Sequence, residues 1–208
     1  MNENSVNSFP ELNGTLELGI NDKKWFVLKT KSRCEKKIAN CAFENGIEYY
    51  LPLIDSFRVY QRKKAHFLKV LIPGYLFVKC DSEEKEVLFR SGYIANFLFV
   101  ANQVELVNDL KRLQEVKMVT QSSSLRNIKI PVEETGFSVV PISDWPEEGF
   151  FVEILSGPLI GLTGLVESVE NADRFIIRVN VIKKAVSIAL GKNQFKVLRK
   201  IKQGETIE

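Results

Sequence analysis

The segment VLIPGYLFV, at residues 70–78, joins a turn signal to an unusually apolar strand. Its Pro-Gly pair predicts a turn, because proline fixes one backbone dihedral angle and glycine tolerates positive φ. Beyond the turn, side chains alternate between the two faces of a strand, so Tyr75 and Phe77 share one face while the leucine and valine beside them share the other. Because both faces are apolar, we expect helices to cover one face and the second face to be buried or to bind a partner.

Tyr75 and Phe77 therefore have two interpretations. They are ordinary core aromatics, as most large aromatic side chains are, or they line a groove for a partner. The pattern alone favours the core interpretation and leaves the groove open.

Length and composition indicate a globular protein of one large or two modest domains. The chain has 208 residues, of which 45% are hydrophobic and 26% are charged. It has no apolar run of the ~18 residues that a membrane-spanning helix needs, so we expect no membrane contact. Residues 1–22 are polar and lack the basic and apolar regions of a secretory signal, which predicts a mobile leader and a cytoplasmic chain.

The charges are segregated along the chain. Residues 23–80 contain thirteen Lys and Arg residues against four Asp and Glu residues, although the net charge of the whole chain is only +3. Part of this excess lies in one stretch with interleaved aromatic residues, a pattern typical of contact with phosphates. The basic members of this stretch are Arg58, Arg62, Lys63, Lys64, His66 and Lys69. The alternative is a solvated hairpin whose lysines protect an edge and maintain solubility.

A second basic group lies at the start of the first predicted helix. Ser32 and Glu35 have the spacing of a capping box, which predicts that a helix begins there, and Gly46 is placed to end it. The first turns of this helix contain Lys31, Arg33, Lys36 and Lys37. Cations oppose the helix dipole at this end, so we interpret the cluster as a phosphate-facing patch, with a solvated helix face as the alternative.

Residues 23–120 show the element order β-α-β-β-α-β-α. This order predicts an α+β domain in which helices pack on an antiparallel sheet. We expect strands at 25–30, 46–54, 75–78 and 93–100, and helices that begin at Ser32, at Asp81 or Ser82, and at Asn108.

The rest of the chain reads as a linker followed by a small barrel. Residues 121–146 contain a serine run and little apolar sequence, which places a domain boundary there. Residues 147–202 contain five short β-prone runs separated by turn residues, which predicts a five-stranded barrel. We expect a tight, glycine-rich loop between its first two strands, since glycine permits the backbone angles of tight turns. The loop contains Gly157, Pro158, Leu159, Gly161 and Gly164.

This series of signals resembles the NusG family of transcription elongation factors. The resemblance rests on residues 25–30, on the basic stretch that leads to Pro73-Gly74-Tyr75, and on the glycine-rich loop at 157–164. It implies an NGN domain over residues 23–120 and a KOW domain, an SH3-like barrel, over residues 147–202. The leader, the long basic stretch and the serine-bearing linker look more like the specialised RfaH-like antiterminators of polysaccharide operons than like the housekeeping members.

The resemblance also implies a mechanism. In the family, an apolar groove of the NGN sheet seats the clamp helices of RNA polymerase, while basic residues beside it touch the non-template DNA strand. Holding both partners suppresses pausing or termination. The groove carries over to Ile72, Tyr75, Phe77, Phe97 and Phe99. The DNA contacts carry over to Lys31, Arg33, Lys36, Lys37, Arg62, Lys63, Lys64 and His66.

Further expectations concern the KOW domain and assembly. The resemblance implies a monomer without a cofactor, and a small-subunit ribosomal protein is a partner of some KOW domains in the family. Housekeeping members often have a phenylalanine after the Gly-Pro of the loop for that contact or for contact with Rho, whereas this chain has Leu159. Both contacts stay open. The β-branched residues of 175–188 favour a stable barrel over a switch to a helical hairpin.

The sequence favours a binding protein over an enzyme. His66 is the only histidine, and the three cysteines, Cys34, Cys41 and Cys80, lack C-x-x-C spacing, so neither a metal site nor a Cys-His pair is indicated. No phosphate-binding loop or dinucleotide fingerprint is present. The alternative within the binding class is a ribosome-associated or RNA-binding KOW protein, in which the basic hairpin grips RNA and the aromatic residues are core.

Overall fold

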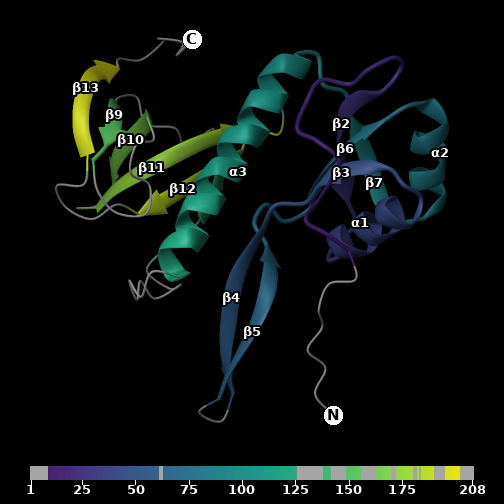
Figure 1. Cartoon of the computed structure of the whole chain (residues 1–208), viewed down its shortest axis with the longest axis horizontal. Helices are drawn as coiled ribbons and strands as arrows, with labels where there is room; N and C mark the ends of the chain where they lie inside the picture. Colours follow the sequence, from purple (N-terminus) through teal and green to yellow (C-terminus); the bar gives the residue numbers. More distant parts are fainter. Residues whose placement is uncertain are drawn as a thin grey trace. The chain divides into compact units, whose positions relative to one another are not determined.

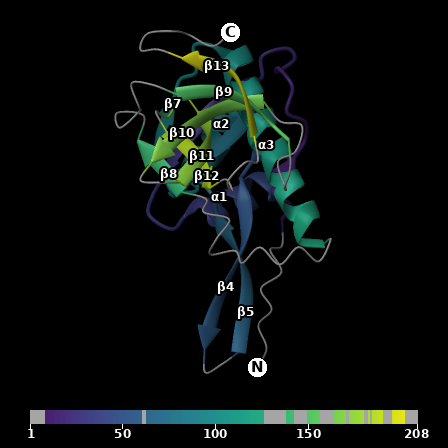
Figure 2. The same ribbon diagram turned by 90° about the vertical axis from the view of Figure 1, so that its left-hand side faces the viewer.

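A computed structural model gives the arrangement of the chain. It describes residues 9–60, 63–125, 138–141, 149–155, 163–169, 172–179, 182, 184–189 and 195–201. The chain divides into two compact units, residues 1–108 and 109–208, and each contains its own antiparallel sheet (Figures 1 and 2). No described helix is long and apolar enough to cross a membrane.

The first unit is built on a five-stranded antiparallel sheet with the predicted α+β organisation. Its strands lie side by side in the order β1 (Leu12–Asn13), β3 (Glu48–Tyr50), β6 (Tyr75–Cys80), β2 (Lys24–Thr30) and β7 (Ile94–Leu98). Two helices accompany it, α1 (Glu35–Glu44) and α2 (Ser82–Arg90). A third helix, α3 (Gln103–Leu125), runs from the first unit into the second.

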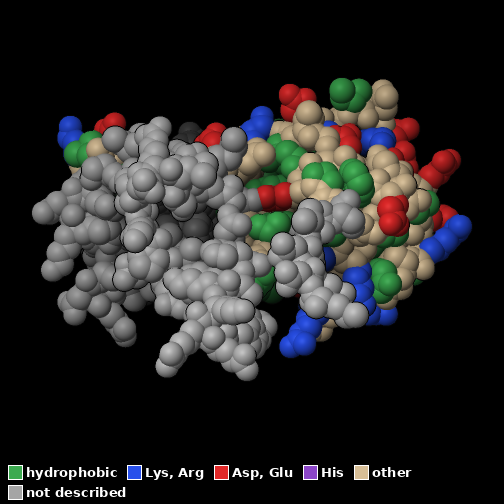
Figure 3. Space-filling view, turned by 60° about the horizontal axis from the view of Figure 1, so that its bottom comes forward, with side chains coloured by type: hydrophobic (Ala, Val, Ile, Leu, Met, Phe, Trp, Pro, Cys, Tyr) green, Lys and Arg blue, Asp and Glu red, His purple; other side chains and the backbone are tan. Residues whose placement is uncertain are grey.

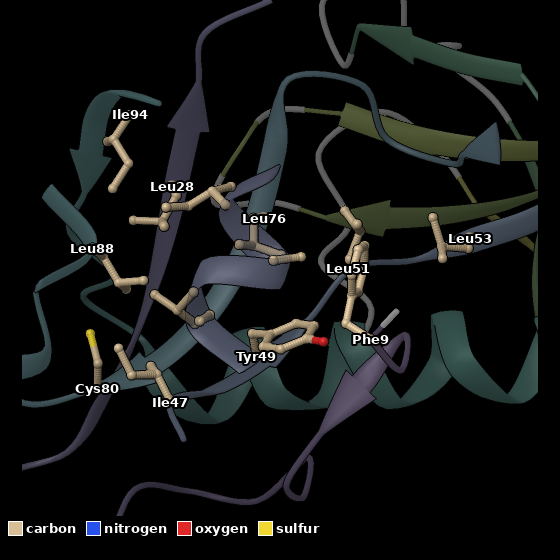
Figure 4. Packing of buried hydrophobic residues seen from close by; sticks show 14 residues of the cluster. Phe9, Leu28, Ile47, Tyr49, Leu51, Leu53, Leu76, Cys80, Leu88 and Ile94 are labelled. Atoms are coloured by element: carbon tan, nitrogen blue, oxygen red, sulfur yellow. The ribbon is translucent and has the colours of Figure 1, made fainter. Parts of the chain in front are cut away.

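One face of this sheet packs against α1 and α2 and is called here the helix face. Leu28 of β2 lies opposite Leu76 of β6, and both are buried in one cluster with Ile38 of α1 and Leu88 of α2 (Figure 4). Because side chains alternate between the two faces of a strand, every second side chain of the apolar segment lies in this core. The opposite face, with Val27, is called the rear face.

Local sequence signals account for some helix ends and fail at others. At α2 the predicted cap is confirmed, and Asp81 rather than Ser82 provides it: Glu84 N–H donates to Asp81 Oδ1 at 2.9 Å. At α1 the predicted capping box is wrong. The N-cap is Cys34, whose side chain makes no capping bond in the described structure. The Glu35 carboxylate, which was expected to cap the helix, accepts instead from Gly74 N–H at 2.6 Å.

The left-handed glycine predicted at the end of α1 is confirmed, since Gly46 has φ +68°. The third helix differs from its prediction. It begins at Gln103, where Asn102 Oδ1 accepts from Glu105 N–H at 3.0 Å, rather than at Asn108. It also continues to Leu125, into the serine run that the sequence assigned to a linker.

The N-terminal segment differs most from its prediction. We expected a mobile leader over residues 1–22, but from Phe9 onward the chain packs on the first unit. Phe9 and Leu16 are buried, and β1 pairs with β3, with Leu12 opposite Tyr50. The composition of this segment did not predict these contacts, because the apolar residues that anchor it are few and widely spaced in a polar sequence.

The basic stretch forms a hairpin, as expected. Strands β4 (Leu53–Tyr60) and β5 (Lys63–Val70) pair with each other in a separate two-stranded sheet. In Figures 1 and 2 this hairpin extends away from the five-stranded sheet.

The second unit contains a six-stranded antiparallel sheet. Its order is β13 (Phe195–Ile201), β9 (Gly149–Ile154), β10 (Thr163–Val169), β11 (Ala172–Val179), β12 (Lys184–Ala189) and β8 (Ser138–Pro141). The five predicted β-prone runs correspond to five of these strands. The sixth, β8, comes from the segment predicted as linker and pairs with β12.

Candidate functional site

The centre of the rear face is a buried apolar row. Cross-strand register places Tyr50, Phe77, Val27 and Leu98 side by side on β3, β6, β2 and β7. Tyr50, Phe77 and Val27 are fully buried, and Leu98 is half-buried. For Phe77, the core interpretation of the sequence is therefore the one that the structure supports.

The neighbouring row of the rear face reaches solvent. It consists of Tyr75, Lys29 and Asn96, of which Tyr75 is half-buried and the other two are exposed. The row ends beside the segment that leads into α1, because Thr30 N–H donates to Gly74 O at 2.9 Å and Lys31 N–H to Tyr93 O at 2.8 Å. The turn that precedes Tyr75 and the backbone at the start of the basic cluster thus lie at the same end of the sheet.

The structure does not gather the five predicted groove residues into one surface. Ile72 and Phe77 are buried. Phe97 lies opposite Leu28 and therefore on the helix face, where its ring packs edge-on against Phe26 with 6.3 Å between centroids. Only Tyr75 keeps the predicted placement on an accessible part of the rear face.

Phe99 lies beyond the end of β7 and is 73% exposed. The sequence placed it with Phe97 by simple alternation. Since β7 has already ended, that alternation no longer fixes the side of the sheet on which Phe99 lies.

A third row of the rear face holds a buried ion pair that sequence reasoning missed. Lys79 lies between Glu48 and Trp25 in register. Its Nζ is 2.6 Å from Glu48 Oε2, 3.3 Å from Thr15 O and 5.7 Å from the centroid of the Trp25 ring. A lysine on the otherwise apolar face of strand 75–80 was the signal for it, since a buried charge needs a partner.

Trp25 is itself fixed from two sides. Its Nε1–H donates to Glu17 O at 2.7 Å. Its backbone N–H donates to Gln103 Oε1 at 2.7 Å, and Gln103 Nε2–H donates to Trp25 O at 3.0 Å. The N-terminal segment and the first turn of α3 thus hold the start of β2.

The basic cluster at α1 separates into exposed and anchored members. Lys31, Arg33 and Lys37 are exposed, and Lys37 Nζ lies 5.5 Å from the centroid of the Tyr93 ring. Arg33 has φ +58°, an uncommon conformation for a residue other than glycine. In the view of Figure 3, Lys and Arg side chains gather along the lower edge of the described surface.

Lys36 differs from the other members of the cluster. Its Nζ donates to the carbonyl of Leu68 on β5 at 2.7 Å, and burial lowers the pKa of this ammonium. The structure therefore directs Lys36 toward the base of the hairpin rather than toward an external phosphate.

The predicted hairpin residues are placed by their backbone. Lys63, Lys64 and His66 lie on β5, where Lys64 is opposite Val59 and His66 is opposite Phe57. Arg62 lies outside the described residues. Lys69, nearer the base, is exposed.

Most of the predicted glycine-rich loop also lies outside the described residues, namely Gly157, Pro158, Leu159 and Gly161. Gly164 is on β10 and lies opposite Val152 of β9.

Burial affects the thiols of two cysteines, Cys41 and Cys80. Burial, with a smaller effect from Glu84 and Asp81, raises the pKa of the Cys80 thiol to about 12, so this thiol is protonated at neutral pH. Burial also raises the pKa of Cys41. Over the described part of the chain, no three His, Cys, Asp or Glu side chains are grouped as a metal site requires.

Comparisons with known proteins point to one family. The family model described as "Transcription termination factor nusG" matches residues 23–135, which is more than half of the chain. Among curated protein sequences, none matches this chain. A solved structure described as "Domain interaction in Thermotoga maritima NusG" is similar at 18% identity, over 85% of this chain and 98% of that chain, with a TM-score of 0.41.

Proposed function

This chain belongs to the NusG family of transcription factors, and we propose that it is an elongation and antitermination factor that bridges RNA polymerase and DNA. The observation that carries the proposal is that the turn before Tyr75 and the cationic segment before α1 lie at the same end of the sheet, where Thr30 N–H donates to Gly74 O. Two binding surfaces at one end of the same sheet would suit a protein that holds two partners at once. No chemical step is involved.

The polymerase contact is proposed at the accessible row of the rear face. Tyr75 is its aromatic anchor, because half-buried aromatic side chains provide much of the binding energy of protein interfaces. The clamp helices of RNA polymerase are the proposed occupant. Phe77 supports this surface from beneath, since it is buried beside Val27 in the adjacent row.

The DNA contact is proposed at the exposed cations, Lys31, Arg33 and Lys37, together with the basic hairpin. Exposed Lys and Arg side chains bind phosphates without reading sequence, so this contact alone gives affinity for the non-template strand rather than a choice of operon. Holding the clamp and the strand together suppresses pausing or termination.

Residues 147–202 are proposed to be the KOW barrel, and the whole chain an RfaH-like specialised factor of polysaccharide operons. Five strands at the predicted positions support the barrel. A small-subunit ribosomal protein is its proposed partner.

Co-purification with RNA polymerase from its own cell tests the polymerase contact. We expect the wild-type chain to retain polymerase, and Tyr75→Ala to weaken retention by about tenfold, as loss of an interface anchor does. The matched control is Phe89→Ala, which removes an exposed aromatic side chain from α2. Equal retention by both variants would contradict the placement of the groove.

The basic hairpin favours one alternative, an RNA-binding KOW protein. A wild-type chain that binds RNA with a steep salt dependence but retains no polymerase would establish this alternative instead.

A further inference from the structure

The base of the β4–β5 hairpin is held by side chains from outside the hairpin. On the β4 side, Leu53 N–H donates to Glu11 Oε1 at 3.0 Å, and Leu51 N–H donates to Glu11 O at 2.9 Å. On the β5 side, Lys36 Nζ donates to Leu68 O at 2.7 Å. A charged side chain therefore binds each strand near the base of the hairpin.

These hydrogen bonds matter because the pairing of the two strands with each other does not fix the direction of the hairpin. Its two strands pair only with each other among the described strands, and an isolated two-stranded sheet is marginally stable in water. Its root is apolar, with Leu53 buried and Leu68 and Val70 packed against the core cluster. Apolar burial is non-directional, whereas hydrogen bonds to charged groups are strong and depend on angle.

Glu11 is itself well fixed, so it can act as a rigid support. It lies next to β1, which pairs with β3. On its other side, the Tyr49 hydroxyl donates to Pro10 O at 2.6 Å, and Phe9 packs edge-on against the Tyr49 ring with 6.5 Å between centroids. The contacts of the N-terminal segment on both sides of Glu11 thus fix Glu11 at the base of the hairpin.

The second grip starts from α1, which carries the exposed cation Lys37 and directly follows the exposed cation Arg33. Lys36 joins this helix directly to β5. The Lys36 side chain therefore joins the hairpin to the cationic end of α1, and a change in hairpin direction alters their relative placement.

We infer that Glu11 and Lys36 are positioning residues that align the basic hairpin with the cations of α1, so that the two basic groups bind one nucleic-acid strand together. This inference rests on the proposed nucleic-acid contact. Neither residue touches the nucleic acid. Their effect is to reduce the ordering that binding would otherwise require.

Glu11 provides a sharp test because two explanations predict opposite signs. Removing an acid near a basic surface raises nucleic-acid affinity if only net charge matters. Removing a support of the hairpin lowers it. We expect Glu11→Ala in the full chain to bind a single-stranded DNA oligonucleotide more weakly by about tenfold, the size of the ordering cost of one or two side chains and a loop.

Two further variants complete the Glu11 test. Glu11→Gln keeps an oxygen acceptor without the charge, so we expect near wild-type affinity. Glu17→Ala is the matched control, since it removes an acid of the same segment whose carboxylate accepts from the Thr15 hydroxyl instead. Equal or tighter binding by all three variants would overturn the inference and leave the proposed function intact.

Lys36→Met tests the second grip and guards against misfolding of Glu11→Ala. We expect weaker binding with an unchanged slope of log affinity against log salt. A slope reduced by about 0.7, the value for one single-strand phosphate contact, would show that Lys36 binds phosphate itself and would overturn its positioning role.

Hydrogen exchange gives a readout independent of DNA. The Leu53 amide should exchange faster in Glu11→Ala than in wild type and Glu17→Ala. Unchanged exchange would contradict the grip, and absence of DNA binding by the wild-type chain would overturn both the inference and the DNA part of the proposed function.

Discussion

Replacing Glu48 with alanine should destabilise the first unit by an amount that the buried ion pair determines. The Lys79 side chain is only 7% exposed, and it loses its carboxylate partner in this variant. Removing one partner of a buried pair costs about 3–5 kcal/mol. Glu48 keeps 27% exposure, and the ammonium retains Thr15 O and the Trp25 ring, so we expect about 2–3 kcal/mol.

Urea unfolding followed by tryptophan fluorescence measures this loss. A Trp145→Phe background lets Trp25, whose ring lies beside Lys79, report alone. The matched control is Glu86→Ala, which breaks the pair with Arg90 on the surface of α2, where both side chains are more than 70% exposed. Exposed pairs contribute about 0–1 kcal/mol, so this control should change little.

The partner substitution separates charge burial from packing. Lys79→Met removes the buried ammonium and keeps an unbranched side chain, so its cost should be smaller than that of Glu48→Ala. If Glu48→Ala shifts the free energy of unfolding no more than Glu86→Ala does, Lys79 does not depend on this carboxylate, and the argument from its burial is wrong.

Three further outcomes follow from the same structure. Phe77→Ala should lower the free energy of unfolding by about 3–5 kcal/mol, because the side chain is fully buried, whereas Tyr75→Ala should cost much less; urea unfolding of both variants compares them. Stability should fall as pH rises from about 9, because burial raises the folded-state pKa of Cys80 from 9.0 to about 12 and the unfolded thiol ionises first; a Cys80→Ala variant whose alkaline stability profile matches wild type would contradict this. Gly14→Ala should destabilise the N-terminal segment, because Gly14 has φ +97° and an added Cβ would overlap the Glu48 side chain; an unchanged melting temperature would show that the segment adjusts freely.

Sequence patterns predicted the parts of the first unit that depend on local order. The apolar strand, the basic hairpin and the Asp81 cap followed from alternation, charge and spacing within a few residues. Phe97 did not follow, because its face depends on the register between β7 and β2, which is set across almost seventy residues of chain. The shift in that register between Lys29 and Thr30 has no local signal.

The other differences have tertiary causes. Glu35 had the spacing of a cap, but Gly74 N–H competes for its carboxylate once the sheet has formed. The two-residue strand β1 is too short for alternation to reveal, and its position depends on Phe9 and Tyr49 packing together. In the candidate site, the cations were predicted from their residue type and Tyr75 from the resemblance to the family. The proposed roles of Glu11 and Lys36 depend on contacts that only the folded chain shows.

The Gln103 side chain makes the hydrogen bonds that a neighbouring strand would make to Trp25. Its planar amide accepts from Trp25 N–H and donates to Trp25 C=O, which is the exchange that two opposed residues make in an antiparallel ladder. The backbone N–H and C=O of Trp25 are therefore both paired at this edge of β2 without a further residue of strand β7. Glutamate has the same shape but no N–H, so it would place a carboxylate against the Trp25 carbonyl. Gln103→Glu would therefore keep the size of the side chain but break the hydrogen bond to Trp25 O. Gln103→Asn would be too short to make both hydrogen bonds.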